Sequence, residues 1–413
     1  MPVFKPFRAF RPTSELAGQI AALPYDVMNS DEARAEVAKN LKSFLHVGKP
    51  EVDLDPSVDL YDASVYNKGK ENLQNYISNG EIVEDTIPSF YVYAQTMDGR
   101  TQYGLVGCAS VDDYWNDKIK KHEFTRKKKE EDRCEHVRVT NAHTGPIFLT
   151  YKDDAEINAK IAEVVKGTPD NDHTADDGIR HTTWVITDSE LNSYLENALA
   201  QKDAFYVADG HHRSAAAAIV GKERQEANSN HTGDEEYNYF LAVLFPASEL
   251  LIMDYNRVVK DLNGHSEEEL FNKIKENFTL SEVSVQHKPT QKGEFGLYMD
   301  GKWYKFNASE AMINNPDPVE KLDVAILQKH VLNDILGIED PRTSDRIDFV
   351  GGIRGLGELE RRVNSGEMKL AISMFPTSIH ELMDIADAGE VMPPKSTWFE
   401  PKLRDGLFVH FLD

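Results

Sequence analysis

The chain has 413 residues, 40% hydrophobic and 28% charged, which is enough for two or three domains with sizeable cores. Its 46 lysines and arginines stand against 70 acidic residues, and this net charge of −24 repels nucleic-acid backbones, so we expect no nucleic-acid partner. No apolar run approaches the roughly 20 residues of a membrane helix, and the first residues lack the apolar core of a secretory signal. The two cysteines, Cys108 and Cys134, form no CxxC pair. We therefore expect a cytoplasmic protein without membrane association.

Hydrophobic spacing and turn residues predict the elements of the first half of the chain. Helices are expected at 14–22, 33–45, 61–77, 127–139, 154–165 and 189–200, and strands at 88–97, 102–111, 146–151 and 181–187. Ser30 is the expected N-cap of the second helix, Asp98-Gly99 the turn between the first two strands, and 167–178 a polar loop.

The next segment, Phe205–Val220, predicts a short apolar strand, a turn at Asp209-Gly210 and an alanine-rich helix. Two histidines and Arg213 stand where that helix begins. A helix N-terminus presents unpaired N–H groups and a partial positive charge, so phosphate can bind there.

After this helix, strands are expected at 237–245 and 250–258, and Asn263-Gly264 breaks the pattern. Helices are then predicted at 267–277, 318–336, 355–364 and 378–388, and strands at 346–352, 368–374 and 406–412. The alternation between 346 and 388 indicates an α/β C-terminal domain.

Each residue of Asp209–Arg213 suits a phosphate site. Gly210 permits a tight turn and close approach of a ligand, Arg213 offers a bidentate fork, and His211 and His212 can donate hydrogen bonds. Asp209 could hold Mg²⁺ or a substrate hydroxyl. The structural alternative is a helix cap by Asp209 with Arg213 in a surface ion pair. Transition-metal binding by the two histidines is disfavoured, because adjacent side chains diverge and no third ligand is near.

The Asp-Gly-His-His-Arg motif resembles the nucleotide-phosphate motif of the ParB/sulfiredoxin-like superfamily, and within it that of ADP-dependent free-serine kinases. The resemblance implies an α+β fold. A ParB/sulfiredoxin-like nucleotide-binding domain would span 1–262, with a large insertion near 51–200, and the α/β C-terminal domain would span 263–413.

The whole chain resembles the bacterial family of domain of unknown function 1015. The marks of that family here are Leu23-Pro-Tyr-Asp-Val27, Lys121-His-Glu-Phe-Thr-Arg126, Glu131-Asp-Arg133, Arg342-Thr-x-x-Arg-Ile-Asp-Phe-Val-Gly-Gly-Ile-Arg354 and Met392-Pro-Pro-Lys-Ser-Thr-Trp-Phe-Glu-Pro-Lys402.

The kinase resemblance implies phosphoryl transfer from ADP or ATP to a hydroxyl such as that of L-serine, with Mg²⁺ bridging the phosphates at Asp209. By position, Glu32 matches the catalytic base, with Asp26 and Asp31 as rivals. A base must reach the attacking hydroxyl. The alternative is that Asp31 and Glu32 only favour the dipole of their own helix.

Two further polar clusters are candidates for the substrate pocket. His122, Glu123, Thr125 and Arg126 combine acid, base, hydroxyl and guanidinium, although Thr125 also suits a helix cap. Lys395, Trp398 and Lys402 lie in a proline-rich loop, where the lysines could meet phosphate and Trp398 a base or a packing partner.

Two functions follow. The first is a small-molecule kinase of the free-serine-kinase type. The second is a ParB-like regulatory protein that binds CTP or ATP without kinase activity, although no convincing helix-turn-helix is present. The sequence leaves a homodimer open.

Overall fold

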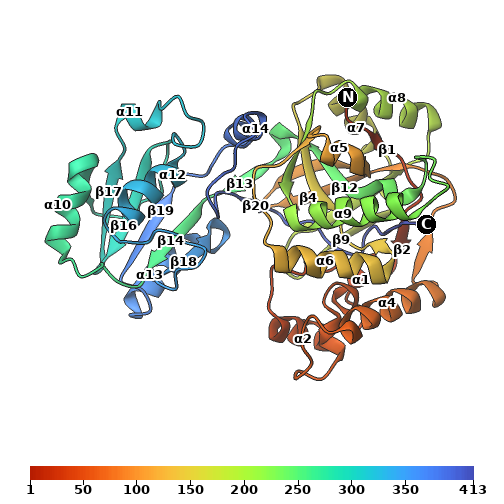
Figure 1. Cartoon of the computed structure of the whole chain (residues 1–413), viewed down its shortest axis with the longest axis horizontal. Helices are drawn as coiled ribbons and strands as arrows, with labels where there is room; N and C mark the ends of the chain where they lie inside the picture. The colour runs from red at the N-terminus through yellow and green to blue at the C-terminus, as the bar shows by residue number, and fades with distance from the viewer. The chain divides into compact units, whose positions relative to one another are not determined.

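The computed structural model describes all 413 residues, which form two compact units (Figure 1). Unit 1 comprises Met1–Leu250 together with Pro401–Asp413, and unit 2 comprises Leu251–Glu400. This division differs from the expected domains, 1–262 and 263–413, because the last segment of the chain returns to unit 1. The break at Asn263-Gly264 is a turn inside unit 2.

Unit 1 is built on a nine-stranded mixed sheet in the order β6-β11-β8-β12-β5-β4-β10-β9, with β1 paired to β5. Its strands are β1 (Phe4–Lys5), β4 (Phe90–Met97), β5 (Arg100–Ser110), β6 (Ile119–Lys120), β8 (Ile147–Tyr151), β9 (Asn171–Thr174), β10 (Arg180–Ile186), β11 (Phe205–Asp209) and β12 (Tyr239–Pro246). The pairs β11–β6 and β12–β8 are parallel, and the others are antiparallel. The mixed α+β class is confirmed, whereas the ParB/sulfiredoxin-like core stays a prediction.

Two short ribbons complete the strands of unit 1. β2 (Phe10–Pro12) pairs with β3 (Ile82–Glu84), and β7 (Ala142–His143) pairs with β21 (His410–Phe411). The second ribbon ties the end of the chain to the segment that precedes β8.

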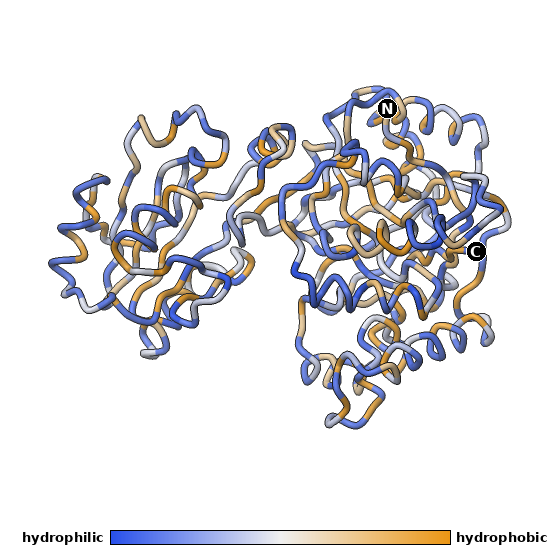
Figure 2. Tube along the Cα trace, viewed as in Figure 1, coloured by the Kyte–Doolittle hydropathy of each residue, from blue (hydrophilic) through white to orange (hydrophobic).

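The helices of unit 1 cover this sheet and pack on each other (Figure 1). They are α1 (Ala17–Ile20), α2 (Ser30–Lys39), α3 (Leu45–Gly48), α4 (Ala63–Ser78), α5 (Val111–Trp115), α6 (Lys127–Thr140), α7 (Ala155–Val164), α8 (Ser189–Ala200) and α9 (His211–Ala227). Helix α9 contacts β8, β12 and α6, and its buried alanines, 215–218, allow this close packing. Hydrophobic residues concentrate along the central strands (Figure 2). None of the helices is both long and apolar enough to cross a membrane.

Several local predictions are confirmed and others are wrong. The hairpin turn at Asp98-Gly99 is present, with φ of 51° and 79°. Ser30 is not the N-cap of α2, because Asn29 accepts the leading N–H groups instead. The polar segment 167–178 contains β9, which pairs only with β10 at the edge of the sheet, where polar side chains are tolerated.

Unit 2 contains a six-stranded sheet in the order β15-β17-β16-β19-β14-β18 and a separate ribbon of β13 and β20. The strands are β13 (Leu251–Met253), β14 (Tyr255–Val259), β15 (Thr279–Val283), β16 (Glu294–Met299), β17 (Lys302–Asn307), β18 (Ile347–Gly351), β19 (Leu370–Met374) and β20 (Trp398–Glu400). The helices are α10 (Glu267–Asn277), α11 (Glu310–Ile313), α12 (Asp323–Leu327), α13 (Gly355–Asn364) and α14 (Ile379–Asp387).

The expected strand–helix–strand of unit 2 is present as β18, α13 and β19, but the sheet is not a parallel α/β sheet. β18 and β19 both pair antiparallel with β14, which lies between them. The helix therefore crosses over a third strand that runs the opposite way. Every strand pair in this sheet is antiparallel, so the expected α/β class of the C-terminal domain is wrong.

Candidate functional site

The strand–turn–helix of unit 1 has the geometry that the sequence predicts. β11 ends at Asp209, Gly210 adopts a left-handed conformation with φ of 92°, and α9 begins at His211. Glycine suits this conformation because it has no side chain to strain. No side chain caps α9, so its leading N–H groups keep the partial positive charge of a helix N-terminus. Such an end can bind an anion.

Asp209 joins this turn to the C-terminal segment. One carboxylate oxygen accepts the N–H of Gly210 at 2.8 Å, and the other accepts Nζ of Lys402 at 2.8 Å. Partial burial opposes ionisation of Asp209, but Lys402 and the N–H of Gly210 hold its pKa below the ordinary value. Asp209 is therefore an ionised carboxylate that fixes the turn, and it does not cap the helix.

Arg213 forms a buried ion pair, which differs from the surface pair of the structural alternative. Its two terminal nitrogens donate to the carboxylate of Asp405 at 2.7 and 2.6 Å, and the two side chains are 16% and 4% exposed. Burial disfavours the guanidinium charge, but Asp405 more than offsets this cost and raises the pKa of Arg213. The fork that we expected to receive phosphate is occupied by a carboxylate.

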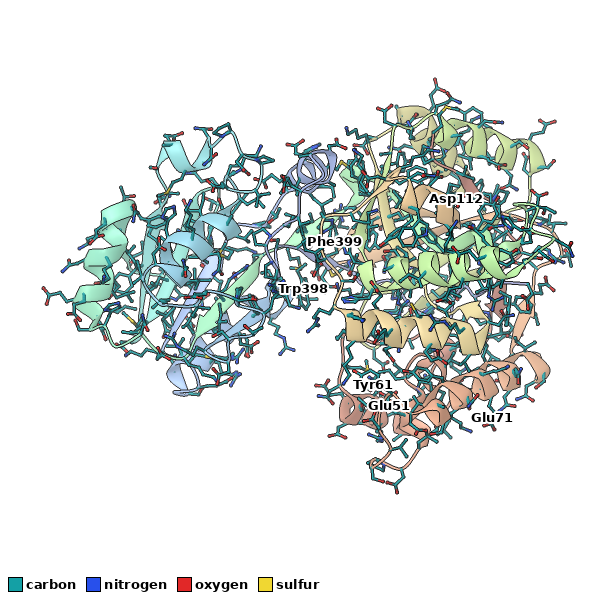
Figure 3. All side chains as sticks on the ribbon, viewed as in Figure 1. Glu51, Tyr61, Glu71, Asp112, Trp398 and Phe399 are labelled. Carbon is teal, nitrogen blue, oxygen red and sulfur yellow. The ribbon has the colours of Figure 1, made fainter.

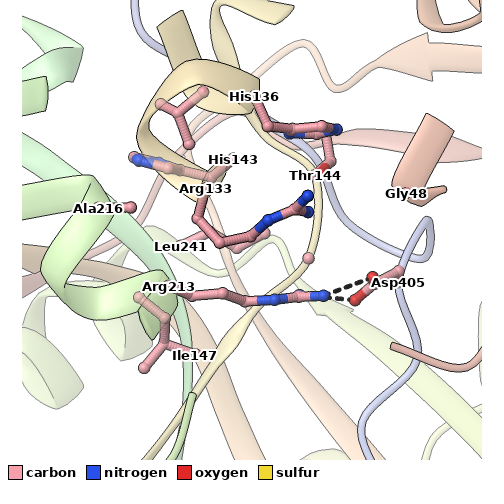
Figure 4. Close-up of a pocket in the computed structure, with 12 residues that line it drawn as sticks. Gly48, Arg133, His136, His143, Thr144, Ile147, Arg213, Ala216, Leu241 and Asp405 are labelled. Carbon is pink, nitrogen blue, oxygen red and sulfur yellow. Dashed lines mark hydrogen bonds and ion pairs between the residues drawn. The ribbon is translucent and has the colours of Figure 1, made fainter. Parts of the chain in front are cut away.

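A small cavity lies beside this ion pair (Figure 4). Its volume is about 30 Å³, room for a water molecule or a hydroxymethyl group and too little for a nucleotide. The lining residues are Gly48, Arg133, His136, Val137, His143, Thr144, Gly145, Ile147, Arg213, Ala216, Leu241 and Asp405. A Cβ on Gly145 would lie 1.8 Å from Nη1 of Arg213, so only glycine lets the ion pair lie against this backbone.

Tyr25 lies between Arg133 and Arg213, next to the Arg213–Asp405 ion pair. The guanidinium of Arg133 is 4.1 Å from the centre of its ring, and that of Arg213 is 5.2 Å away. Burial, with the nearby charge of Asp26, raises the pKa of Tyr25 to about 12. Asp26 also raises the pKa of Arg213, so of the three candidate carboxylates it is the one that acts on the ion pair.

Glu32 closes the N-terminus of its own helix. Its carboxylate accepts the N–H of Asn29 at 2.8 Å, while Asn29 accepts the N–H of Glu32 at 2.9 Å, a reciprocal capping box. Asp31 is 97% exposed and faces Arg34 at 3.6 Å. Both carboxylates thus have the capping and dipole roles of the structural alternative, and neither lines the cavity.

The sheet brings His122 and His211 together. Their rings meet edge to face with centres 4.4 Å apart, and Nδ1 of His211 is 3.8 Å from Glu123. Both rings are buried, and Nε2 of His211 has no hydrogen-bond partner. Burial lowers the pKa of His211 to about 4, and burial with the neighbouring His211 lowers that of His122. The two imidazoles are therefore neutral at pH 7.

Arg126 and Thr125 stand at the start of α6. The backbone N–H of Arg126 donates to Nε2 of His212 at 3.0 Å, so the candidate segment 122–126 contacts the Asp209–Arg213 motif. Burial, together with Lys129 and Arg126, lowers the pKa of His212. Thr125 donates to Glu130 at 2.5 Å, which is a local helix-start contact and does not cap the helix.

Lys395 and Trp398 belong to unit 2, and Trp398 is labelled in Figure 3. Trp398 packs against Gly351 and against Tyr255, whose ring centre is 5.0 Å away, and its N–H donates to Glu400 at 2.8 Å. Nζ of Lys395 lies 5.6 Å from the ring centre of Tyr255. Trp398 is therefore the packing partner of the structural alternative, and only Lys402 of this loop meets the motif.

The magnesium proposed at Asp209 would have one protein ligand. No group of three or more His, Cys, Asp or Glu side chains is arranged to hold a metal. Mg²⁺ usually keeps several waters and binds through one or two carboxylates and the substrate phosphates. The ionised, 40% exposed Asp209 fits that single-carboxylate role.

The protein therefore has a mixed α+β fold. Its candidate site is the turn between β11 and α9, where the helix has no side-chain cap and Arg213 pairs with Asp405 of the C-terminal segment. The chain belongs to the family described as "Protein of unknown function (DUF1015)", whose model matches residues 4–325. No curated protein matches the chain.

The solved structures that are similar to the chain include the following three. A free serine kinase mutant in complex with AMP is 15% identical and covers 71% of this chain and 87% of its own, with a TM-score of 0.37. A conserved hypothetical protein from Pyrococcus furiosus is 16% identical, with coverage of 73% and 94% and a TM-score of 0.35. SbnI from Staphylococcus aureus, with a C-terminal truncation, is 11% identical, with coverage of 74% and 87% and a TM-score of 0.40.

Proposed function

We propose that this protein is a nucleotide-dependent phosphotransferase. ADP or ATP donates a phosphoryl group to the hydroxyl of a small metabolite such as L-serine, and the nucleotide phosphates bind at residues 209–213. One observation carries the proposal: the uncapped N-terminus of α9, with Gly210 in the left-handed conformation and Lys402 beside it.

The charges around this turn support phosphate binding. Lys402 is 17% exposed, and its ammonium lies at the turn through its contact with Asp209. The N–H groups of the first turn of α9 add a positive potential that needs no side chain. Mg²⁺ bound to the phosphates would neutralise the charge that develops on the transferred group. Because the ammonium of Lys402 is balanced by the ionised Asp209, the surplus positive potential at this turn comes from the helix N–H groups and from Mg²⁺ carried by the phosphates.

The size of the neighbouring cavity supports a small acceptor. About 30 Å³ admits the hydroxymethyl end of a metabolite, and the nucleotide must stay outside it. With ADP as donor, the acceptor oxygen bonds to the β-phosphorus, the bond from that phosphorus to the bridging oxygen breaks, and AMP leaves. The proton of the hydroxyl passes to a base. Glu32 is the base implied by sequence position, and Asp26 is the carboxylate that acts on Arg213.

The test is direct. The full chain is incubated with Mg²⁺ and labelled serine, with ADP in one series and ATP in another, and the products are separated. We expect O-phosphoserine with AMP or ADP. Lys402→Ala should raise the KM for nucleotide at least tenfold, about 1.4 kcal/mol of binding, whereas exposed Lys166→Ala should not change it.

Two results would contradict the proposal. A nucleotide-induced rise in melting temperature without phosphoryl transfer to serine or to other small alcohols would favour the nucleotide-binding regulator. Absence of both would remove the nucleotide site. Asp26→Asn and Glu32→Gln, assayed alongside, separate the two carboxylates, since a base contributes roughly 10²- to 10⁴-fold to the rate.

A further inference from the structure

A chain of three side chains, formed by two buried histidines and the partly exposed Glu236, leads from the surface of unit 1 to the cavity beside Arg213. Nε2 of His410 is 2.8 Å from a carboxylate oxygen of Glu236, and Nδ1 of His410 is 3.2 Å from Nδ1 of His143. His143 lines the cavity. The two histidines face each other because β7 and β21 place them in register.

The contacts dictate the tautomers. Because the carboxylate of Glu236 only accepts, the proton of a neutral His410 sits on Nε2, and its Nδ1 is an acceptor. The hydrogen bond between the two Nδ1 atoms then requires His143 to donate from Nδ1. The Nε2 atom of His143 is left as a lone pair. That atom is buried without any hydrogen-bond partner, which is a costly arrangement unless a ligand or water meets it.

We propose that His143 accepts the proton of the acceptor hydroxyl at Nε2, and that His410 and Glu236 are positioning residues that hold its tautomer. As the hydroxyl oxygen bonds to phosphorus, its proton moves to Nε2 of His143. The Nδ1 proton of His143 can pass to Nδ1 of His410, whose Nε2 proton passes to Glu236. Glu236 is 38% exposed, so the proton leaves to solvent there. This inference rests on the proposed function.

The surroundings keep His143 unprotonated until that step. The charged and titratable groups that face the pair are Arg213 and Arg224 of α9, Arg133 and His136 of α6, Asp405 of the C-terminal segment, and Lys5 and Glu236 behind His410. Burial, the neighbouring His410 and Arg224 all lower the pKa of His143. Neither Asp26 nor Glu32 lines the cavity. Of the basic groups that do, Nε2 of His136 is bonded to the carbonyl of Val47 and Asp405 is paired with Arg213, which leaves Nε2 of His143.

The first test reads the tautomers without any activity. Protein labelled with ¹⁵N-histidine is examined by long-range ¹H–¹⁵N spectra at neutral pH, and the resonances are assigned with His143→Gln and His410→Gln. We expect an unprotonated Nε2 in His143 and an unprotonated Nδ1 in His410. A protonated Nε2 in His143 would overturn the proposal.

The second test reads the rate against pH. His143→Gln should lower kcat by about 100-fold or more and remove the fall in activity that we expect of the wild type when acid protonates His143. His410→Gln and Glu236→Gln should lower kcat by less than His143→Gln does. They should also shift the pH at which activity falls in acid, and the KM for nucleotide should not change. His173→Gln is the matched control, since His173 also has an Nε2 without a partner and lies outside the cavity.

The outcomes separate this inference from the function on which it rests. Transfer at the full rate by folded His143→Gln removes only the role of His143. Absence of transfer by the wild type removes the proposed function and that role together. If His143→Gln does not fold, the wild-type tautomers and the pH profiles of the two positioning variants decide.

Discussion

Asp405 and Arg213 show how much of the site depends on a single buried carboxylate. The pair is bidentate, almost fully buried, and packed against Gly145, where no side chain would fit. Removing one partner of such a pair leaves the other charge buried and uncompensated.

Asp405→Asn should destabilise unit 1 by about 3–5 kcal/mol, because the guanidinium of Arg213 would lose its only bidentate partner. Urea unfolding, followed by a probe in unit 1, measures the change. Asp413→Asn is the matched control: it removes a carboxylate 3.0 Å from Arg224 that is 77% exposed, and an exposed pair contributes about 0–1 kcal/mol. Equal losses of stability in the two variants would show that burial does not determine how much an ion pair contributes to the stability of unit 1.

The residues of the site fall into two groups by how well the sequence predicts them. Asp209–Arg213 follow one another, so local pattern was enough to place the turn and the helix start. Tyr25 and Asp405 were not predicted, because their roles arise from contacts across long stretches of chain. The one available signal for Tyr25 was its place in the Pro-Tyr-Asp mark of the family.

At the scale of the element, the turn between β11 and α9 is set by backbone conformation. Gly210 has φ of 92°, and an added Cβ would meet nothing closer than 3.8 Å. A side chain at position 210 would therefore strain the backbone conformation without clashing with any neighbour.

Gly210→Ala should destabilise unit 1 by about 1–2 kcal/mol, the cost of a left-handed conformation for a residue with a side chain. Thermal or urea unfolding checks it. Gly357→Ala offers the comparison, since that glycine lies in α13, has no positive φ and has open space around its Cα. There alanine should be neutral or stabilise by up to about 1 kcal/mol. A neutral Gly210→Ala would mean that the turn relaxes into another conformation.

Elements were predicted well where hydrophobic period and turn residues agreed, as in the hairpin of β4 and β5. They were missed where pairing overrides composition. β9 consists of Asn-Asp-His-Thr, a polar sequence that becomes a strand only because β10 offers it an edge. The antiparallel sheet of unit 2 was missed because β14, which ends at Val259, pairs with strands that begin only at Ile347 and Leu370.

For the whole molecule, buried neutral histidines make the stability of unit 1 depend on pH. Burial lowers the pKa of His136 to about 3 and that of His211 to about 4. The unfolded chain, with an ordinary value of 6.5, therefore binds more protons in acid than the folded chain does. The stability that these histidines contribute is complete above pH 6.5. It is lost as the pH falls from 6.5 towards their pKa values in the folded chain.

We expect the free energy of unfolding to fall by up to about 1.4 kcal/mol per pH unit for each such histidine below the ordinary value. Urea midpoints at a series of pH values test this. His136→Gln, whose amide can still donate to the carbonyl of Val47, should flatten the dependence, whereas exposed His380→Gln should leave it unchanged. A curve that does not change in His136→Gln would assign the acid sensitivity to other groups.

The first and last strands of unit 2, β13 and β20, are neighbours, so the chain leaves unit 1 and returns to it at adjacent points. Leu251 pairs with Glu400 across the ribbon of β13 and β20, so the two crossing points are about 5.5 Å apart or less. Replacing residues 251–400 with a short Gly-Ser linker should leave unit 1 folded, with the Arg213–Asp405 pair intact. Near-ultraviolet circular dichroism and the unfolding midpoint test this. A chain that fails to fold cooperatively would show that unit 1 needs unit 2.

The return of residues 401–413 to unit 1 also sets an order of events during synthesis. Lys402 and Asp405 leave the ribosome after all of unit 2 has been made, and so do Phe408 and Val409, which are fully buried in unit 1. Unit 2 is contiguous and can fold as soon as it emerges. The first 250 residues, in contrast, cannot complete their fold at this stage, because the core lacks Phe408 and Val409 and Arg213 lacks Asp405. A ribosome-bound chain stalled before residue 401 would therefore hold a folded unit 2 behind an unfinished, chaperone-dependent unit 1.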